Sequence, residues 1–284
     1  MGEGATPVQA HDGARAGEIV AFDRAARTLT LRRGPSQGEP PRTLSLIPGT
    51  PLDTKPLAAR VRVACEDFAE GGTAHPHIAV LLRRDPPRLR GRAGGDPIVP
   101  SGVTDPGVRL APTIEAMRSL DRSWLAIQGP PGAGKTYTLG HAIAALIEEG
   151  RSVGVLSNSH KAVDNVIRAV EKRWADREDG CAPWRGRAFK KDSRGEFAFD
   201  GVGTVTQSVG GMGDVPGDAV LVGGTAWAFA HKDCPTRDVL VLDEAGQVSL
   251  GNLVAATSAR SIVLVGDQMQ FPNRSKARIR ARAA

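Results

Sequence analysis

The chain has 284 residues, 40% hydrophobic and 24% charged, with a formal net charge of +6, a composition typical of globular domains rather than of disordered tails. Its three cysteines, Cys65, Cys181 and Cys234, form no C-x-x-C pair, which argues against a disulfide framework or a zinc site. No apolar run reaches the roughly 20 residues of a membrane helix, so the sequence predicts a cytoplasmic protein with no membrane partner.

The N-terminal part predicts a small, β-rich accessory domain with a linker, residues 1–110. Apolar residues alternate across residues 17–33, the pattern of a β-hairpin. Residues 55–69 have helical spacing, and residues 77–84, "HIAVLLRR", are expected to form another strand. Residues 86–112 are rich in Pro, Gly and Arg, which predicts a long connection or a domain boundary.

The chain changes character in residues 111–272, where apolar runs alternate with helical stretches. The five runs are "WLAIQ", "SVGVLS", "AVLVGG", "DVLVLDEA" and "SIVLVGD". Continuous runs of this kind are typical of parallel strands buried on both faces, so we expect a doubly wound α/β domain. Residues 175–217 are polar and glycine-rich and are interpreted as a variable insertion, and residues 273–284 form a basic tail.

A phosphate-binding loop lies between the first of these runs and a helix. Residues 129–136, "GPPGAGKT", match G-x-x-x-x-G-K-[ST] in the context that the motif requires. The backbone N–H groups would form an anion nest, Lys135 would reach the β and γ phosphates, and the Thr136 hydroxyl would ligate Mg²⁺. The predicted nucleotide-binding residues are Gly129, Pro130, Pro131, Gly132, Ala133, Gly134, Lys135, Thr136 and Tyr137.

An acidic pair follows the apolar run "VLVL". Asp243 and Glu244 are expected at the carboxyl edge of the sheet, where ligands of open α/β sheets bind. We expect Asp243 to hold Mg²⁺ and Glu244 to act as the general base that positions the attacking water.

Together with the sequence around them, these residues resemble superfamily 1 helicases. "DEAGQ" is similar to motif II of that family, and "VGDQMQ", about twenty residues later, is similar to motif III. The resemblance implies a RecA-like P-loop NTPase domain that binds ATP and Mg²⁺. It also implies that Gln270 senses the γ-phosphate and takes part in catalysis.

Two further segments extend the resemblance. "VGVLSNSHKAVDNVI" is similar to motif Ia and "GGTAWAFA" to motif Ic, which implies that Ser159, His160, Asn165 and Thr225 contact single-stranded DNA or RNA. The whole set resembles bacterial fusion proteins in which a RecB-like nuclease precedes an RNA-surveillance-type helicase, which implies a nuclease domain as a further partner. The basic net charge is compatible with nucleic acid, and equally with a solvated surface.

The sequence departs from this family in two ways. No glutamine that could read the adenine precedes the loop within residues 108–123, so the preference for ATP rests on the family. The sequence also stops shortly after motif III, so we expect the second motor domain to be missing, and with it the arginine that accelerates hydrolysis. Hydrolysis by the chain alone is therefore expected to be weak or undetectable, as for a fragment, a frameshift product or a natural truncation.

Two alternative functions fit part of the pattern. A nucleotide switch that regulates a partner without moving a strand would need the same loop and acidic pair, but neither "SNSHKAVDN" nor "GDQMQ". A small-molecule kinase would need an acceptor pocket where Glu244 is placed. The sequence leaves open whether DNA or RNA is bound and in which direction the motor moves.

Overall fold

The computed structural model describes residues 3–39, 41–49, 54–99, 102–103, 105–175, 187–191 and 206–267. The chain forms two compact units, Met1–Thr54 and Lys55–Ala284. None of the helices in these described ranges is both long and apolar enough to cross a bilayer.

The first unit is built from short antiparallel strands. β2 (Glu18–Asp23) pairs with β3 (Thr28–Arg32), and β1 (Val8–Gln9) pairs with β4 (Leu46–Ile47), with the turn η1 (Pro35–Gln37) between β3 and β4. The hairpin predicted over residues 17–33 is confirmed. Ile19, opposite Leu31 in the register, is buried, whereas the paired residues Phe22 and Leu29 are exposed. The apolar alternation therefore marks a buried face only near Ile19.

The second unit contains a seven-stranded sheet in which every neighbouring pair is parallel. Its strands are β5 (Trp124–Gln128), β6 (Val153–Leu156), β7 (Ala188–Lys191), β8 (Thr206–Val209), β9 (Leu221–Gly224), β10 (Arg237–Leu242) and β11 (Ala259–Gly266). They lie in the order β5-β11-β10-β6-β9-β7-β8. The five predicted strands and the parallel α/β architecture are thus confirmed.

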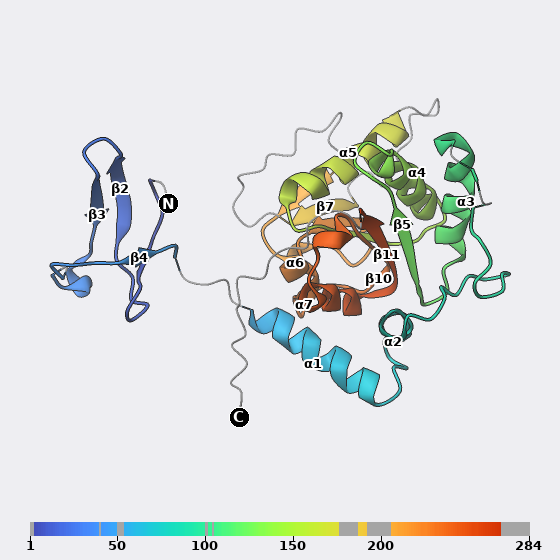
Figure 1. Ribbon diagram of the computed structural model, residues 1–284, viewed down its shortest axis with the longest axis horizontal. Helices are drawn as coiled ribbons and strands as arrows, with labels where there is room; N and C mark the ends of the chain where they lie inside the picture. The colour runs from blue at the N-terminus through green and yellow to red at the C-terminus, as the bar shows by residue number, and fades with distance from the viewer. Residues whose placement is uncertain are drawn as a thin grey trace. The chain divides into compact units, whose positions relative to one another are not determined.

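Helices cover both faces of this sheet (Figure 1). They are α1 (Lys55–Ala69), α2 (Pro76–Arg83), α3 (Pro106–Ser119), α4 (Lys135–Glu148), α5 (His160–Ala175), α6 (Ala226–Ala230) and α7 (Leu250–Leu253), with the turns η2 (Met212–Asp214), η3 (Ala245–Gln247) and η4 (Val254–Ser258). In β10, Val239 and Val241 join the core under α3, α4 and α5, whereas Leu240 and Leu242 join the core under α1, α6 and η4. Every residue of the run from 239 to 242 is buried, which explains why the apolar run is continuous.

The region before the phosphate loop differs from its prediction. Residues expected to form a strand at 77–84 are helix α2, which begins with Pro76 at its first turn and ends at Arg84 in the left-handed conformation. α1 and α2 pack in the core of the second unit through Leu57 and Ile78. The boundary between the compact units therefore lies after Thr54, earlier than the predicted division after residue 110.

Part of the predicted connection and part of the predicted insertion are regular structure. Helix α3 begins within residues 86–112, where the carboxylate of Asp105 accepts the N–H of Gly107. The insertion contributes β7 and β8 to the sheet. The polar sequence "AFKK" of β7 does not look like a buried strand. Lys190 is buried there because it forms an ion pair, 2.6 Å long, with Asp164 of α5, and the sequence of the strand alone cannot show this partner.

Candidate nucleotide and nucleic-acid site

The phosphate loop connects β5 to α4 in a backbone conformation that requires glycine at two positions. Gly132 and Gly134 have φ values of +79° and +78°, which residues with a side chain adopt only at a cost. The Gly129 N–H donates to the Gly266 carbonyl at the end of β11, 3.1 Å away. The start of the loop is thereby fixed to the strand that carries the motif III residues.

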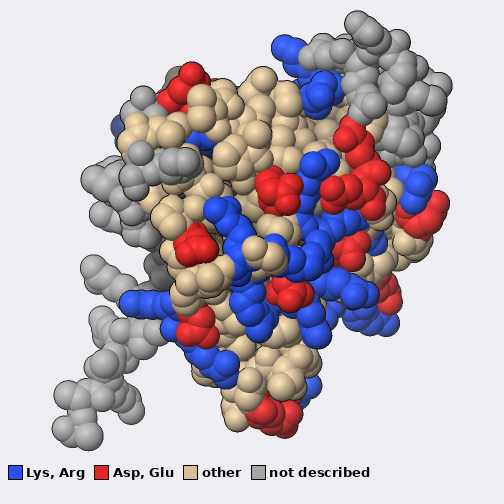
Figure 2. All heavy atoms as spheres, turned by 90° about the vertical axis from the view of Figure 1, so that its right-hand side faces the viewer, with Lys and Arg blue, Asp and Glu red and all other residues tan. Residues whose placement is uncertain are grey.

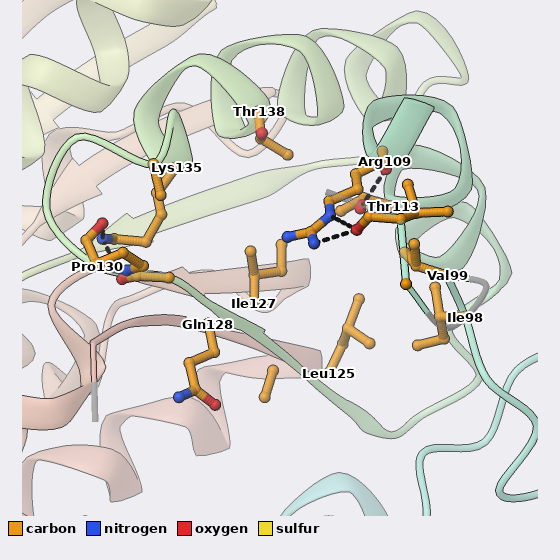
Figure 3. Close-up of a pocket in the computed structure, with 15 residues that line it drawn as sticks. Ile98, Val99, Arg109, Thr113, Leu125, Ile127, Gln128, Pro130, Lys135 and Thr138 are labelled. Atoms are coloured by element: carbon orange, nitrogen blue, oxygen red, sulfur yellow. Dashed lines mark hydrogen bonds between the residues drawn. The ribbon is translucent and has the colours of Figure 1, made fainter. Parts of the chain in front are cut away.

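The Lys135 side chain lies across the loop. Its Nζ donates to the carbonyl oxygens of Gly129 and Pro130, at 2.7 Å and 2.9 Å (Figure 3). The next two residues, Thr136 and Tyr137, are exposed at the start of α4, and the Tyr137 ring lies 4.2 Å from that of His141. All of the predicted nucleotide-binding residues thus lie in one loop and the first turn of one helix.

A cavity of about 680 Å³ adjoins this loop (Figure 3). Gly129 and Lys135 line one part of it, and apolar side chains that include Ile98, Val99 and Ile127 line another. Arg109 extends from α3 between these parts, and its Nε donates to the Val103 carbonyl at 2.7 Å. The cavity joins cationic and apolar walls, as a site for a phosphorylated and partly apolar ligand requires.

The acidic pair follows β10, two strands from β5 in the sheet. The Asp243 N–H donates to the Leu156 carbonyl of neighbouring β6 at 2.8 Å. Burial raises the pKa of the Asp243 carboxyl, while the backbone N–H of Glu244 and the positive charge of Lys135 pull it down. The phosphate loop after β5 and the acidic pair after β10 therefore lie at the same carboxyl edge of the parallel sheet, and the positive charge of Lys135 acts on the Asp243 carboxyl.

Glu244 has an uncommon backbone conformation. Its φ of 56° and ψ of 38° are left-handed, which is unfavourable for a residue with a side chain and is often found at functional sites. The turn after Glu244 lies against the end of β11, where a Cβ added at Gly246 would lie 2.7 Å from the Asp267 carbonyl oxygen. Only glycine fits this contact between motifs II and III. Gln270, the predicted γ-phosphate sensor, lies outside the described residues, as does the tail 273–284.

Three of the four predicted nucleic-acid residues lie at the same carboxyl edge of the sheet. Ser159 and His160 follow β6, and Thr225 follows the adjacent strand β9. The two strand ends are joined by a bond from the Ser157 N–H to the Gly224 carbonyl, 3.4 Å long. Asn165 is exposed further along α5, about one and a half turns from His160, so it does not share the same helix face.

Asn158 is a residue that the sequence interpretation missed. Its Nδ2 donates to the Gln247 carbonyl at 3.0 Å, which ties the loop after β6 to the turn after Glu244. The sequence "SNS" shows a polar residue after a strand, but it does not indicate which residue Asn158 contacts, because that partner lies 89 positions away. The predicted nucleic-acid segment and the acidic turn are therefore linked directly.

The described residues leave few options for a metal. Among them, no group of three or more His, Cys, Asp or Glu side chains could hold an ion. Thr136 and Asp243 offer hard oxygen donors, which suit Mg²⁺ because this ion takes only one or two protein ligands and completes its shell with phosphates and water. The donor set thus fits Mg²⁺ bound with a nucleotide and does not fit a permanent metal centre.

Comparison with known families decides the nature of this domain. Residues 111–277, more than half of the chain, match the family model described as an AAA domain. The chain belongs to the AAA domain family. In this AAA domain, the nucleotide-binding loop and the acidic turn both lie within the matched residues.

Two curated proteins, both helicase/nucleases, are similar to this chain. The DNA replication ATP-dependent helicase/nuclease JHS1 of Arabidopsis thaliana is 31% identical over 163 residues, covering 53% of this chain and 11% of that protein. The DNA replication ATP-dependent helicase/nuclease DNA2 of Saccharomyces cerevisiae is 31% identical over 91 residues, covering 31% of this chain and 6% of that protein. The predicted resemblance to superfamily 1 helicases is confirmed, although the chain spans only a small part of these relatives.

A solved structure is less similar to this chain. The complex of the Arterivirus nonstructural protein 10 helicase with DNA aligns with a TM-score of 0.34 and 15% identity, covering 52% of this chain and 29% of that chain. At this score the likeness is too slight for a comparison of the two sites.

Proposed function

We propose that this chain is the ATP-hydrolysing motor domain of a superfamily 1 helicase, in which hydrolysis is coupled to the binding of single-stranded nucleic acid. The observation that carries the proposal is the position of the phosphate loop after β5 and of the acidic pair after β10, at the carboxyl edge of the sheet that also holds the segment after β6. DNA is the favoured strand, because both relatives are named DNA replication helicases.

ATP would bind with its phosphates in the loop and its nucleoside in the adjoining cavity. The loop supplies backbone N–H groups and the Lys135 ammonium for the phosphates. Thr136 and Asp243 would hold Mg²⁺, whose charge would offset the charge that develops on the phosphates. Within the cavity, Arg109 and the apolar side chains would contact the sugar and base.

Glu244 would act as the general base. It follows Asp243 directly, and its left-handed backbone turns the chain sharply at the end of β10. A carboxylate at this point can accept a proton from the attacking water on the side of the metal-binding residue. Gln270 would contact the γ-phosphate, and the loss of this contact after hydrolysis would change the position of the residues that follow β11.

The nucleic-acid strand would cross the ends of β6 and β9. Ser159, His160 and Thr225 offer small polar groups there, and Asn165 extends the surface along α5. Contacts of this kind to phosphates and sugars position a strand without reading its sequence. The first unit would serve as an accessory domain, and a second RecA-like domain and a nuclease domain would be the partners of this motor.

A nucleotide switch without strand movement is the second candidate. It would use the same loop and acidic turn, and the contact between Asn158 and Gln247 would then serve a bound protein partner instead of a strand. The two candidates differ in one measurable respect, because only the motor requires that single strands bind and stimulate hydrolysis.

Single-stranded nucleic acid is expected to bind weakly and without sequence preference, because the proposed contacts reach mainly phosphates and sugars. Strong salt dependence is expected because a chain with a net charge of +6 attracts a polyanion. Filter binding of two unrelated oligonucleotides at two salt concentrations measures this. His160→Ala together with Asn165→Ala should weaken binding severalfold, whereas Arg62→Ala on α1 should leave it unchanged. Sequence-selective or salt-insensitive binding would contradict the helicase proposal.

Asn158→Asp is expected to reduce the stimulation of hydrolysis by a bound strand at least about fivefold, since aspartate cannot donate to the Gln247 carbonyl and a lost hydrogen bond of this kind costs about 1–3 kcal/mol. Phosphate release is measured with and without saturating oligonucleotide, so that a change in affinity does not enter. Asn252→Asp on α7 is the matched control with the same change in charge. Equal stimulation in the Asn158→Asp and natural chains would show that this contact transmits nothing.

A further inference from the structure

An arginine cluster covers one side of the second unit, away from the proposed strand path. We define it as Arg88, Arg90, Arg118, Arg122 and Arg151. Figure 2 faces the side on which α3 lies, and Lys and Arg side chains gather in the middle of that face. Residues 83–122 contain eight arginines and no lysine, against five Asp and Glu, so the cationic character of this segment comes entirely from guanidinium groups.

Hydrogen bonds to backbone carbonyls hold the cluster together. Arg88 donates to the Arg122 carbonyl at 2.6 Å, and Arg90 donates to the Arg118 carbonyl at 2.9 Å. Arg151 donates to the Met117 carbonyl at 3.3 Å. A carbonyl fixes a guanidinium group without cancelling its charge and leaves its other N–H donors available.

Few carboxylates neutralise these charges. Among the described residues, only Arg118 of the five forms an ion pair, with Glu149 at 2.8 Å. Asp121 is next to Arg122 in the sequence, and its backbone N–H donates to the Arg88 carbonyl. Arg88, Arg90 and Arg122 are exposed and carry a surplus of positive charge.

The short segment that carries Arg88 and Arg90 is anchored to the domain. Leu89, between them, forms a β-bridge with Leu120 and packs against the core under α3. Because Leu89 points into the protein, the arginines on either side of it point outward, about 6.6 Å apart along an extended chain. The spacing presents two fixed cations to a polyanion.

The cluster lies at the opposite edge of the sheet from the proposed strand path. Arg118 and Arg122 precede β5, and Arg151 precedes β6, so these residues lie near the amino ends of the strands. Ser159 and Thr225 follow the carboxyl ends of β6 and β9. Four or five residues of strand, about 15 Å, separate the two edges.

We infer that the arginine cluster is a second nucleic-acid surface, which binds the phosphate backbone of a part of the substrate that does not lie on the path over β6 and β9. Guanidinium groups match phosphate oxygens in geometry and charge. Guanidinium groups that hydrogen bonds already hold in place lose little side-chain entropy on binding. This inference rests on the proposed function only for the class of partner, and the cluster needs neither the nucleotide nor the acidic turn. Single-stranded and duplex flanks share this phosphate chemistry.

The test compares two triple variants of the full chain in fluorescence anisotropy titrations with a labelled single strand and a labelled duplex. Replacing Arg88, Arg90 and Arg122 by Gln should weaken binding about 10- to 100-fold and reduce the slope of log K against log salt by about 2 to 3. Replacing the same three by Lys, which keeps the charge but not the guanidinium geometry, should retain the salt slope and lose less affinity than the Gln variant. The form that loses more affinity in the Gln variant, strand or duplex, identifies the flank.

A matched control removes the same charge elsewhere. Gln at Arg27, Arg62 and Lys232, three exposed and scattered cations, should change affinity no more than about twofold. If the triple Gln variant melts lower than the natural chain, Arg122→Gln alone gives the test, because the Arg122 side chain forms no hydrogen bond with another of the described residues. That single variant should still reduce the salt slope by nearly 1.

Three outcomes would overturn the inference. The cluster variant could bind like the scattered control, or the Lys variant could lose as much of the salt slope as the Gln variant. Polyglutamate could also compete for the cluster as well as nucleic acid does, which would indicate an acidic protein partner. Failure of the proposed path gives a different result. In that case His160→Ala with Asn165→Ala has no effect on strand binding, while the cluster variants still do.

Discussion

Replacing Lys135 by alanine is expected to abolish the binding of Mg-ATP at concentrations that saturate the natural chain. Lys135 is the one cation of residues 129–136, and its Nζ lies over the loop carbonyls of Gly129 and Pro130. Removing one partner of a charge pair at a binding site costs about 2–5 kcal/mol, which corresponds to an affinity loss from about 30-fold to more than 1,000-fold.

Equilibrium titration with a fluorescent ATP analogue measures this loss. Lys172→Ala, which removes an exposed lysine from the last turn of α5, is the matched control and should bind as the natural chain does. Thermal unfolding of both variants verifies the fold. Unchanged affinity in Lys135→Ala would mean that the nucleotide site lies outside this loop.

The features that the sequence predicted correctly depend on local chemistry. The phosphate loop was predictable because its spacing requires glycine at positions such as Gly132 and Gly134, where φ is positive. The parallel sheet was predictable because β10 contains a continuous apolar run, residues 239–242, that is buried on both faces.

The errors have a common cause, which is that distant partners decide the structure. "HIAVLL" is too short an apolar run to distinguish a strand from a helix, and contacts with η4, such as that between His77 and the Ala256 carbonyl, favour the helix. β7 is a strand in spite of its lysines because Asp164 neutralises Lys190. The local sequence around His77 or Lys190 does not indicate that Ala256 or Asp164 is its partner.

The candidate site shows the same division. Its charged residues were named from motifs, but the way in which they are joined could not be. The contact of Gly246 with Asp267 and the bond from Asn158 to the Gln247 carbonyl both link segments far apart in the sequence. These links make one unit of the loop after β6, the acidic turn and the end of β11.

Replacing Glu244 by glutamine is expected to reduce ATP hydrolysis about 10²- to 10⁴-fold while ATP binding changes little. Glutamine keeps the size of the side chain and makes no greater demand on the left-handed backbone, but it cannot accept the proton of the attacking water. Steady-state phosphate release, measured with a second motor domain fused after Gln270 so that hydrolysis is fast enough to follow, and the ATP analogue titration measure the two quantities separately. Glu115→Gln, at an exposed position of α3, is the matched control and should change neither.

Supplying a second RecA-like motor domain, fused after Gln270, is expected to raise hydrolysis by the natural chain by up to about 10³- to 10⁵-fold and to leave Glu244→Gln slow. Lys135, Thr136 and Asp243 can gather metal and phosphates on one side of the γ-phosphate only, and the charge that develops in transfer needs a cation from the opposite side. A nucleotide switch with a self-contained site would hydrolyse ATP equally fast with or without the added domain. A folded fusion that gives no increase in phosphate release would therefore exclude the motor and favour the switch.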